Sequence, residues 1–96
     1  MAKGYWVTFY RSVSNPATLA EYAKLAGPAI EKGGGRILAR TTATKGYEGG
    51  VKERVVLIEF DRVEKAISTI DSPEYSAAQK LLEGAVEREI RIVEGI

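Results

Sequence analysis

Hydrophobic and polar positions divide the chain into segments of two kinds, one with the period of a strand and one with the period of a helix. Four segments are rich in β-branched and aromatic residues or alternate between apolar and charged positions, and we predict that each is a strand. The predicted strands are residues 4–11, 36–42, 52–60 and 87–93. The first and third are apolar on both faces and the others are more polar, so we expect the first and third to be central in a sheet.

A long helix is predicted between the first two strands. Asn15 is a good N-cap and Pro16 suits the first helical position, so the helix should begin there. Apolar residues then recur at three- and four-residue steps as far as Ile30, which gives one apolar face. Pro28 should kink or shorten the last turn, and the glycines at 33–35 should end the helix.

A second helical region follows the third strand and is broken in two. Asp61 with Glu64 three residues later matches a capping box, which predicts a helix that begins at Asp61. Ser72 followed by Pro73 restarts the chain as a further short helix, and Gly84 should end it.

The resulting order, β-α-β-β-α-β with the second helix broken in two, is typical of the ferredoxin-like α+β fold with a four-stranded antiparallel sheet. We expect residues 1–96 to form this one domain. Helices in such a fold cover one face of the sheet, yet both central strands are apolar on both faces. A monomer would therefore expose more apolar surface than soluble monomers usually tolerate, and we predict a homodimer that packs sheet against sheet.

The pattern leaves open which sheet face is the dimer interface. A tryptophan on a central strand is a typical interface anchor. The residues assigned to the interface are Trp6, Val56, Ile58 and Phe60.

Composition excludes several classes of function. The 96 residues include 14 basic and 13 acidic side chains, a net charge of +1 that argues against nucleic acid as a partner. Cysteine and histidine are both absent, which excludes disulfides, thiolate and imidazole metal sites, and histidine-based triads. No apolar run is long enough to cross a bilayer and no signal-peptide stretch is present. We expect a cytoplasmic protein with no metal, no cofactor and no membrane partner.

Glu59 is the most informative single residue, because a carboxylate near the end of an apolar central strand is costly unless it is paired. One interpretation makes Glu59 a catalytic general base whose pKa is raised in a dry cleft. The other, which we favour, pairs it with an arginine, for which Arg40 and Arg54 are candidates, or places it at the solvent-exposed end of the strand.

Arg40 and Arg54 lie on adjacent strands that flank the loop containing Glu48. Such a cluster could hold a carboxylate-bearing small molecule through paired hydrogen bonds, or an arginine–glutamate pair could lock the loop. Tyr22 and Tyr75 are candidates for lining a cleft between helices and sheet, where a hydroxyl can donate to a ligand. Alternatively, both tyrosines fill the core.

The last strand alternates charged residues with Ile and Val, which is typical of a half-exposed sheet edge. Arg88 and Arg91 separate its glutamates, and we interpret these charges as solvated protection of the edge. A metal site there is not expected without histidine.

Short motifs recur in order along nearly the whole chain. They are GYW at 4–6, Asn15-Pro16, GGR at 34–36, Leu38 with Arg40, Glu48-Gly49, Val56-x-Ile58-Glu59-Phe60, Ser72-Pro73-Glu74-Tyr75 and Val93-Glu94-Gly95. Together these motifs resemble the bacterial family called domain of unknown function 1330. The resemblance implies a dimeric α-β barrel related to small cofactor-free monooxygenases and muconolactone isomerase-like proteins, and it implies no established activity.

The leading hypothesis is a small protein that binds an apolar or weakly acidic molecule between sheet and helices. If it is an enzyme, the resemblance points to cofactor-free oxygenation or isomerisation, with Glu59 as base, Arg40 or Arg54 as anion holder and Tyr22 or Tyr75 as orienting hydroxyl. The alternative is a non-catalytic structural or protein-interaction module that acts as a dimer. A pocket with converging polar groups would favour the first hypothesis, and a closed dry core the second.

Overall fold

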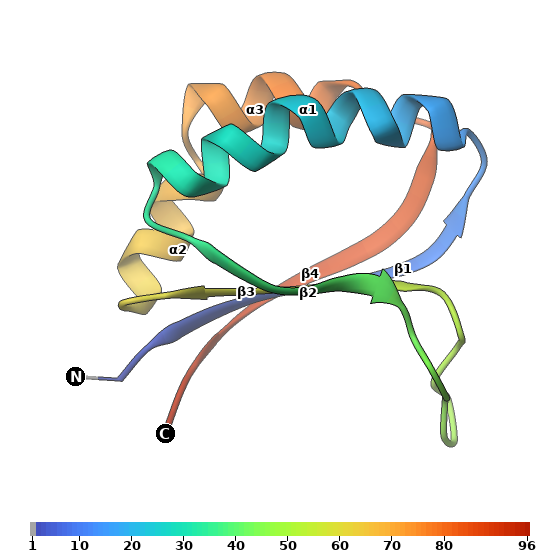
Figure 1. Cartoon of the computed structure of the whole chain (residues 1–96), viewed down its shortest axis with the longest axis horizontal. Coiled ribbons are helices and arrows are strands. Elements are labelled where there is room, and N and C mark those ends of the chain that lie inside the picture. The colour runs from blue at the N-terminus through green and yellow to red at the C-terminus, as the bar shows by residue number, and fades with distance from the viewer. Residues whose placement is uncertain (1) are drawn as a thin grey trace.

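Four strands form one antiparallel sheet in the computed structural model, which describes residues 2–96 (Figure 1). All three helices lie on one face of this sheet (Figure 1). In chain order the elements are β1 (Gly4–Val13), α1 (Pro16–Lys32), β2 (Arg36–Thr42), β3 (Arg54–Phe60), α2 (Val63–Ile70), α3 (Pro73–Lys80) and β4 (Val86–Glu94). The strand order is β2-β3-β1-β4, so β1 and β3 are central. The predicted ferredoxin-like α+β fold is confirmed.

Two helix starts follow the capping signals of the sequence. The side chain of Asn15 accepts a hydrogen bond from the backbone N–H of Thr18, and α1 begins at the next residue, Pro16. The Ser72 hydroxyl accepts from the backbone N–H of Tyr75 at 3.2 Å in the same way, at the start of α3. Each cap satisfies an N–H that the first turn of a helix otherwise leaves unpaired.

Two other boundaries differ from the prediction. The helix α1 continues through Pro28 to Lys32 and is not shortened, because buried residues on both sides of the proline hold this helix against the sheet. The prediction that a capping box begins a helix at Asp61 is wrong. The helix α2 begins at Val63, and the side chain of its N-cap residue, Arg62, makes no capping hydrogen bond. The Asp61 carboxylate accepts from Arg36 of β2 at 3.1 Å instead.

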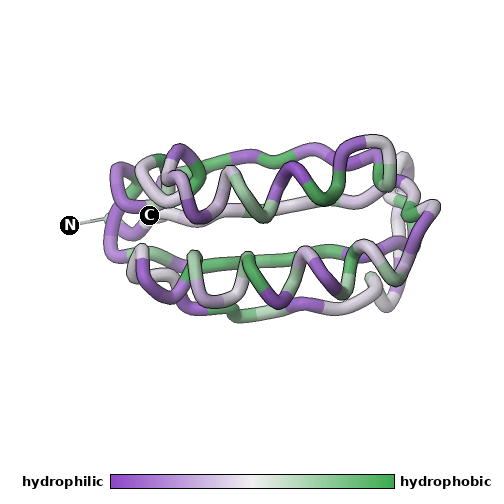
Figure 2. The backbone as a smooth tube through the Cα atoms, turned by 90° about the horizontal axis from the view of Figure 1, so that it is seen from above, coloured by the Kyte–Doolittle hydropathy of each residue, from purple (hydrophilic) through white to green (hydrophobic). Residues whose placement is uncertain are grey.

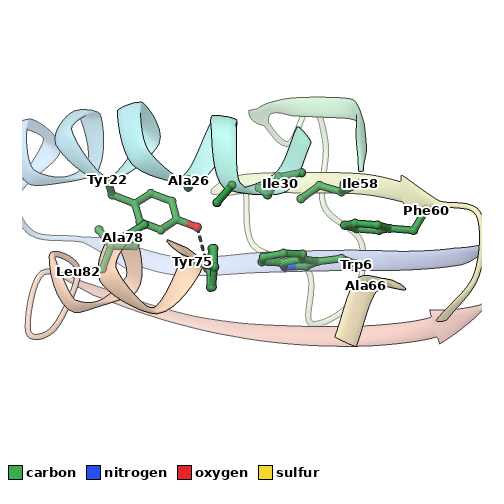
Figure 3. Close-up of a cluster of buried hydrophobic side chains, with 11 residues drawn as sticks. Trp6, Tyr22, Ala26, Ile30, Ile58, Phe60, Ala66, Tyr75, Ala78 and Leu82 are labelled. Atoms are coloured by element: carbon green, nitrogen blue, oxygen red, sulfur yellow. Dashed lines mark hydrogen bonds between the residues drawn. The ribbon is translucent and has the colours of Figure 1, made fainter. Parts of the chain in front are cut away.

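The core lies between the sheet and the helices and is built around aromatic rings. Trp6 and Phe60 stack with their centroids 6.4 Å apart, and the ring of Tyr75 meets Trp6 edge-on at 4.8 Å. Figure 3 shows these rings in one layer beneath α1. Edge-to-face contacts of this kind add to the free energy that burial of the rings supplies.

The assignment of Trp6, Val56, Ile58 and Phe60 to a dimer interface is wrong. All four face the helices of their own chain, and three of them are at most 1% exposed. The close approach of α2 to β1 explains which face is covered. A Cβ on Gly4 would lie 2.6 Å from the backbone of Val63, so only glycine allows the helix to pack there.

The opposite face of the sheet carries the alternate residues of the central strands and no helix (Figure 1). Its apolar side chains are half-buried or exposed. Those that the two central strands contribute are Tyr5, Val7, Phe9, Val55 and Leu57. We call these five residues the open face. The uncovered apolar face predicted from the strand pattern is therefore present, but it is formed by the other set of side chains.

Within the helix layer, α1 and α3 pack against each other. Viewed from the helix side, α1 runs alongside α3 (Figure 2). The Nζ of Lys32 on α1 donates to Glu74 on α3 at 2.7 Å. None of the helices within residues 2–96 has the length and apolar character that crossing a bilayer requires.

Candidate anion-binding site

A small cavity lies between α1 and the covered face of the sheet. It encloses about 30 Å³, which is space for roughly two or three water-sized groups. Apolar side chains such as Ile30 and Ile58 form part of its wall. Three arginines also line it, each from a different strand: Arg40 of β2, Arg54 of β3 and Arg88 of β4.

Strand alternation turns these arginines toward the helices. Arg40 pairs in register with Val56, and Arg88 pairs with Tyr10, so both share the covered face. Arg40 is exposed, whereas Arg54 and Arg88 are half-buried. The cavity is therefore more exposed to solvent at Arg40 than at the guanidinium groups of Arg54 and Arg88.

Three tyrosine hydroxyls hold the guanidinium group of Arg88. Its Nη1 donates to Tyr10 at 3.2 Å and to Tyr22 at 3.3 Å, and its Nη2 donates to Tyr75 at 3.1 Å. Burial opposes the charge of Arg88, but its contacts with Tyr22, Tyr75 and Tyr10 outweigh burial and raise its pKa. Arg88 is thus a fixed cation whose hydrogen-bond partners are all neutral.

The hydroxyl oxygens of Tyr22 and Tyr75 lie 2.8 Å apart within this cluster (Figure 3). Burial is the main cause that raises the pKa of Tyr22, and burial also raises the pKa of Tyr10. Both phenols therefore stay protonated at neutral pH. They can donate a hydrogen bond to a ligand but cannot serve as bases without a large cost.

Arg54 carries a buried hydrogen-bond donor with no acceptor. Its Nε is the one buried side-chain nitrogen or oxygen without a partner within residues 2–96. Its guanidinium carbon lies 5.9 Å from the centroid of the Tyr10 ring, and that of Arg88 lies 5.6 Å from the same centroid. An unpaired buried donor costs about 1–3 kcal/mol, so this N–H calls for an acceptor that a ligand can supply.

The cavity holds positive charge that no carboxylate of residues 2–96 neutralises in an ion pair. Within residues 2–96, none of Arg40, Arg54 and Arg88 forms an ion pair with a carboxylate. Like charges that gather in a partly desolvated space repel one another unless an anion joins them. The arrangement is suited to bind the acidic group of a small molecule.

Glu59 lies outside this site, on the opposite face of the sheet. Its carboxylate accepts from Arg36 Nε at 3.0 Å and from the Tyr5 hydroxyl at 3.2 Å. The hydrogen bond from Arg36 lowers the pKa of Glu59, which contradicts a general base with a raised pKa in a dry cleft. The favoured interpretation, that Glu59 forms an ion pair with an arginine, is confirmed. The arginine is Arg36, however, and neither Arg40 nor Arg54.

The structure brings together four of the five predicted ligand-binding residues. Arg40, Arg54 and Tyr22 line the cavity, and Tyr75 lies directly behind Tyr22. Glu48 is exposed in the loop between β2 and β3, forms no ion pair with either arginine, and is not part of the cavity. The alternative in which an arginine–glutamate pair locks this loop is therefore wrong.

Sequence reasoning missed Arg88, the central residue of the site. The charge alternation of β4 groups Arg88 with Arg91 as solvated edge protection, yet Arg88 lines the cavity and Arg91 lies on the open side of the sheet, where it pairs with Glu89. The signal was present in the alternation of β4. Arg88 has the same parity as Ile90 and Ile92, which pack against the core, so its side chain had to enter the interior.

The fold and the site together define a ferredoxin-like α+β protein with an arginine-lined pocket between helix and sheet. The chain belongs to the family described as Domain of unknown function (DUF1330), whose model matches residues 3–96. The family resemblance stated from the motifs is thereby confirmed. No curated protein sequence matches this chain significantly.

Solved structures with the same fold cover almost the entire chain. A protein of unknown function from Rhodopseudomonas palustris has a TM-score of 0.74 and 18% identity, over 99% of this chain and 83% of its own. A dimeric ferredoxin-like protein of unknown function from Thermobifida fusca has a TM-score of 0.68 and 14% identity, over 99% and 92%. A proposed antibiotic biosynthesis monooxygenase from Nitrosomonas europaea has a TM-score of 0.66 and 13% identity, over 99% and 90%. At these identities the similarity concerns the fold.

Proposed function

We propose that this protein binds a small organic acid as its anion, in the cavity between α1 and the sheet. The observation that carries this proposal is the group of Arg40, Arg54 and Arg88 around one cavity without a carboxylate from residues 2–96. Guanidinium groups bind carboxylates through charge-assisted hydrogen bonds, which are about twice as strong as neutral ones.

The size of the cavity sets how such a ligand is oriented. About 30 Å³ accommodates an acidic head group but not a whole aromatic or branched molecule. The head group would therefore reach Arg54 and Arg88, and the apolar remainder would lie along α1 toward Arg40. Gly27 lines this path, and a Cβ added there would meet no atom within 4 Å, so α1 leaves room for that remainder.

Calorimetric titration with acetate, butanoate and benzoate tests the proposal, with benzamide as the neutral match for benzoate. The Arg88→Met and Arg54→Met variants should each weaken benzoate binding by about tenfold or more, because a charge-assisted hydrogen bond is lost. Arg91→Met is the matched control, since Arg91 is on the same strand as Arg88 but on the other face. Equal affinity for benzoate and benzamide, or no saturable binding of any of the acids, would refute the proposal.

We also infer that two copies of the chain pack through the open face defined above. The support is its apolar side chains, including Phe9 at 39% exposure, which no helix covers. A dimeric neighbour of the same fold adds to this support. The arginine pocket is on the opposite side of the sheet, so each copy would keep its own cavity.

A further inference from the structure

The groups around the cavity offer more free hydrogen-bond donors than free acceptors. Arg54 Nε has no acceptor within residues 2–96, and Arg88 is a permanent cation at the same cavity. The positions of the hydroxyl protons can be derived from the remaining contacts, because each buried donor needs an acceptor.

Either hydroxyl of the Tyr22–Tyr75 pair could be the donor, and the surroundings of the two residues favour Tyr75. Tyr75 is fully buried and does not line the cavity, and Tyr22 does. If Tyr22 donated to Tyr75, the proton of Tyr75 would be left in the core without an acceptor among residues 2–96. The alternative costs less: Tyr75 donates to Tyr22, and the proton of Tyr22 is then free to meet a ligand.

The same argument applies to the hydroxyl protons of Thr8 and Tyr10. The oxygen of Thr8 accepts from Trp6 Nε1 at 2.9 Å, and the oxygen of Tyr10 accepts from Arg88 at 3.2 Å. Both residues line the cavity, and neither hydroxyl proton has an acceptor within the described chain. The cavity therefore presents hydroxyl and guanidinium donors together, with no carboxylate or carbonyl acceptor among the side chains that line it.

We propose that the cavity selects the oxyanion of a weak acid, a phenolate or an enolate, over its neutral hydroxyl form. This inference rests on the proposed function and names its ligand class. A neutral phenol would find as acceptors for its own proton only hydroxyl oxygens that already accept from Trp6, Arg88 or Tyr75. Its anion accepts from Tyr22 and Arg54 and gains the charge of Arg88, as in oxyanion sites built from fixed donors.

The proton balance of this selection is simple. When the phenol or enol binds, its O–H bond breaks, the electron pair stays on oxygen, and the proton passes to a base in the solvent. No oxidant, metal or second substrate is needed for this step. For an enolisable ketone the same donors would stabilise the enolate that forms when a base in the solvent removes the carbon-bound proton and the electron pair of that bond moves to oxygen.

A chromophoric acid measures the selection directly. 4-Nitrophenol is held at a pH equal to its pKa in water, and its phenolate absorbance is followed as protein is added. We expect the bound compound to have a pKa about one to three units lower, which raises its phenolate fraction toward completeness. Tyr22→Phe and Arg54→Met should each reduce this shift, whereas Tyr47→Phe should leave it unchanged because Tyr47 is 72% exposed and does not line the cavity.

The outcomes separate this inference from the proposed function. Binding of benzoate together with an unshifted or raised pKa of bound 4-nitrophenol would overturn the oxyanion selection and leave anion binding intact. Loss of both signals would refute both proposals. A shift that survives in Tyr22→Phe and in Arg54→Met alike would also overturn the inference, because it would arise from donors other than those assigned.

Discussion

The hydroxyl oxygens of Tyr22 and Tyr75 lie 2.8 Å apart in the interior, although 53 positions separate these residues in the chain. One comes from α1 and the other from α3, and Arg88 of β4 donates to both. A single hydrogen-bonded group therefore ties two helices to an edge strand. Because the same group borders the cavity, the stability of the helix layer and the chemistry of the site depend on shared residues.

The Tyr22–Tyr75 hydrogen bond should appear as coupling between two substitutions. We expect Tyr22→Phe and Tyr75→Phe each to lower the free energy of unfolding by about 1 kcal/mol. The double variant should lose less than the sum, because the first substitution already breaks the bond between them. Urea unfolding followed by circular dichroism gives all three values. Strict additivity would show that the two hydroxyls do not interact in solution.

Glu59 should stabilise the fold at neutral pH and lose that effect in acid. Its pKa in the folded state is lowered, chiefly by the hydrogen bond from Arg36, so its contribution is present above its unfolded pKa and is lost as the pH falls through the folded value. Glu59→Gln should therefore be less stable than the parent near pH 7, and the difference should shrink below about pH 4.

Urea unfolding at several pH values measures this difference. Glu31→Gln is a suitable control, since Glu31 is exposed and forms no ion pair within residues 2–96. Because Glu59 is on the open side of the sheet, Glu59→Gln should also leave benzoate binding unchanged. A tenfold loss of binding in Glu59→Gln would restore a role for this carboxylate in the site.

Two glycines should respond to alanine in opposite directions. In Gly4→Ala the new Cβ would lie 2.6 Å from backbone atoms of Val63, so β1 and α2 must separate, at a cost of about 1–3 kcal/mol or more. In Gly27→Ala the new Cβ meets nothing within 4 Å, and alanine in a helix interior should add about 0.5–1 kcal/mol. Thermal unfolding of both variants distinguishes these outcomes. Equal effects of the two substitutions would contradict the packing of α2 against β1.

The fold could be predicted from sequence because its signals are local or periodic. Caps at Asn15 and Ser72 involve residues within three positions, and the two-sided apolar pattern of the central strands sets the strand order. The capping box at Asp61 failed because a long-range partner, Arg36, took the carboxylate. Capping competes with such ion pairs, and the sequence does not show which prevails.

The site was harder to predict, because it depends on which face of each strand the helices cover. Parity alone groups Trp6 with Ile58 and Phe60 but does not say whether a helix or a second sheet covers them. Gly4 indicates the answer, because only glycine lets a helix approach the sheet closely at this position, on the face that also carries Trp6. With the face known, the inward position of Arg88 follows, and so does the outward position of Glu59.

The open face should hold two copies of the chain together. Leu57 lies at its centre, opposite Val7 in the register of β1 and β3. Leu57→Arg places a charge that would have to be desolvated in the interface, so we expect a folded monomer where the parent protein is a dimer. Leu25→Arg is the matched control, because Leu25 is 48% exposed on α1, on the other side of the molecule. Sedimentation equilibrium at micromolar concentration gives the masses. A monomeric parent protein, or equal dissociation in both variants, would show that the apolar face is not the contact between subunits.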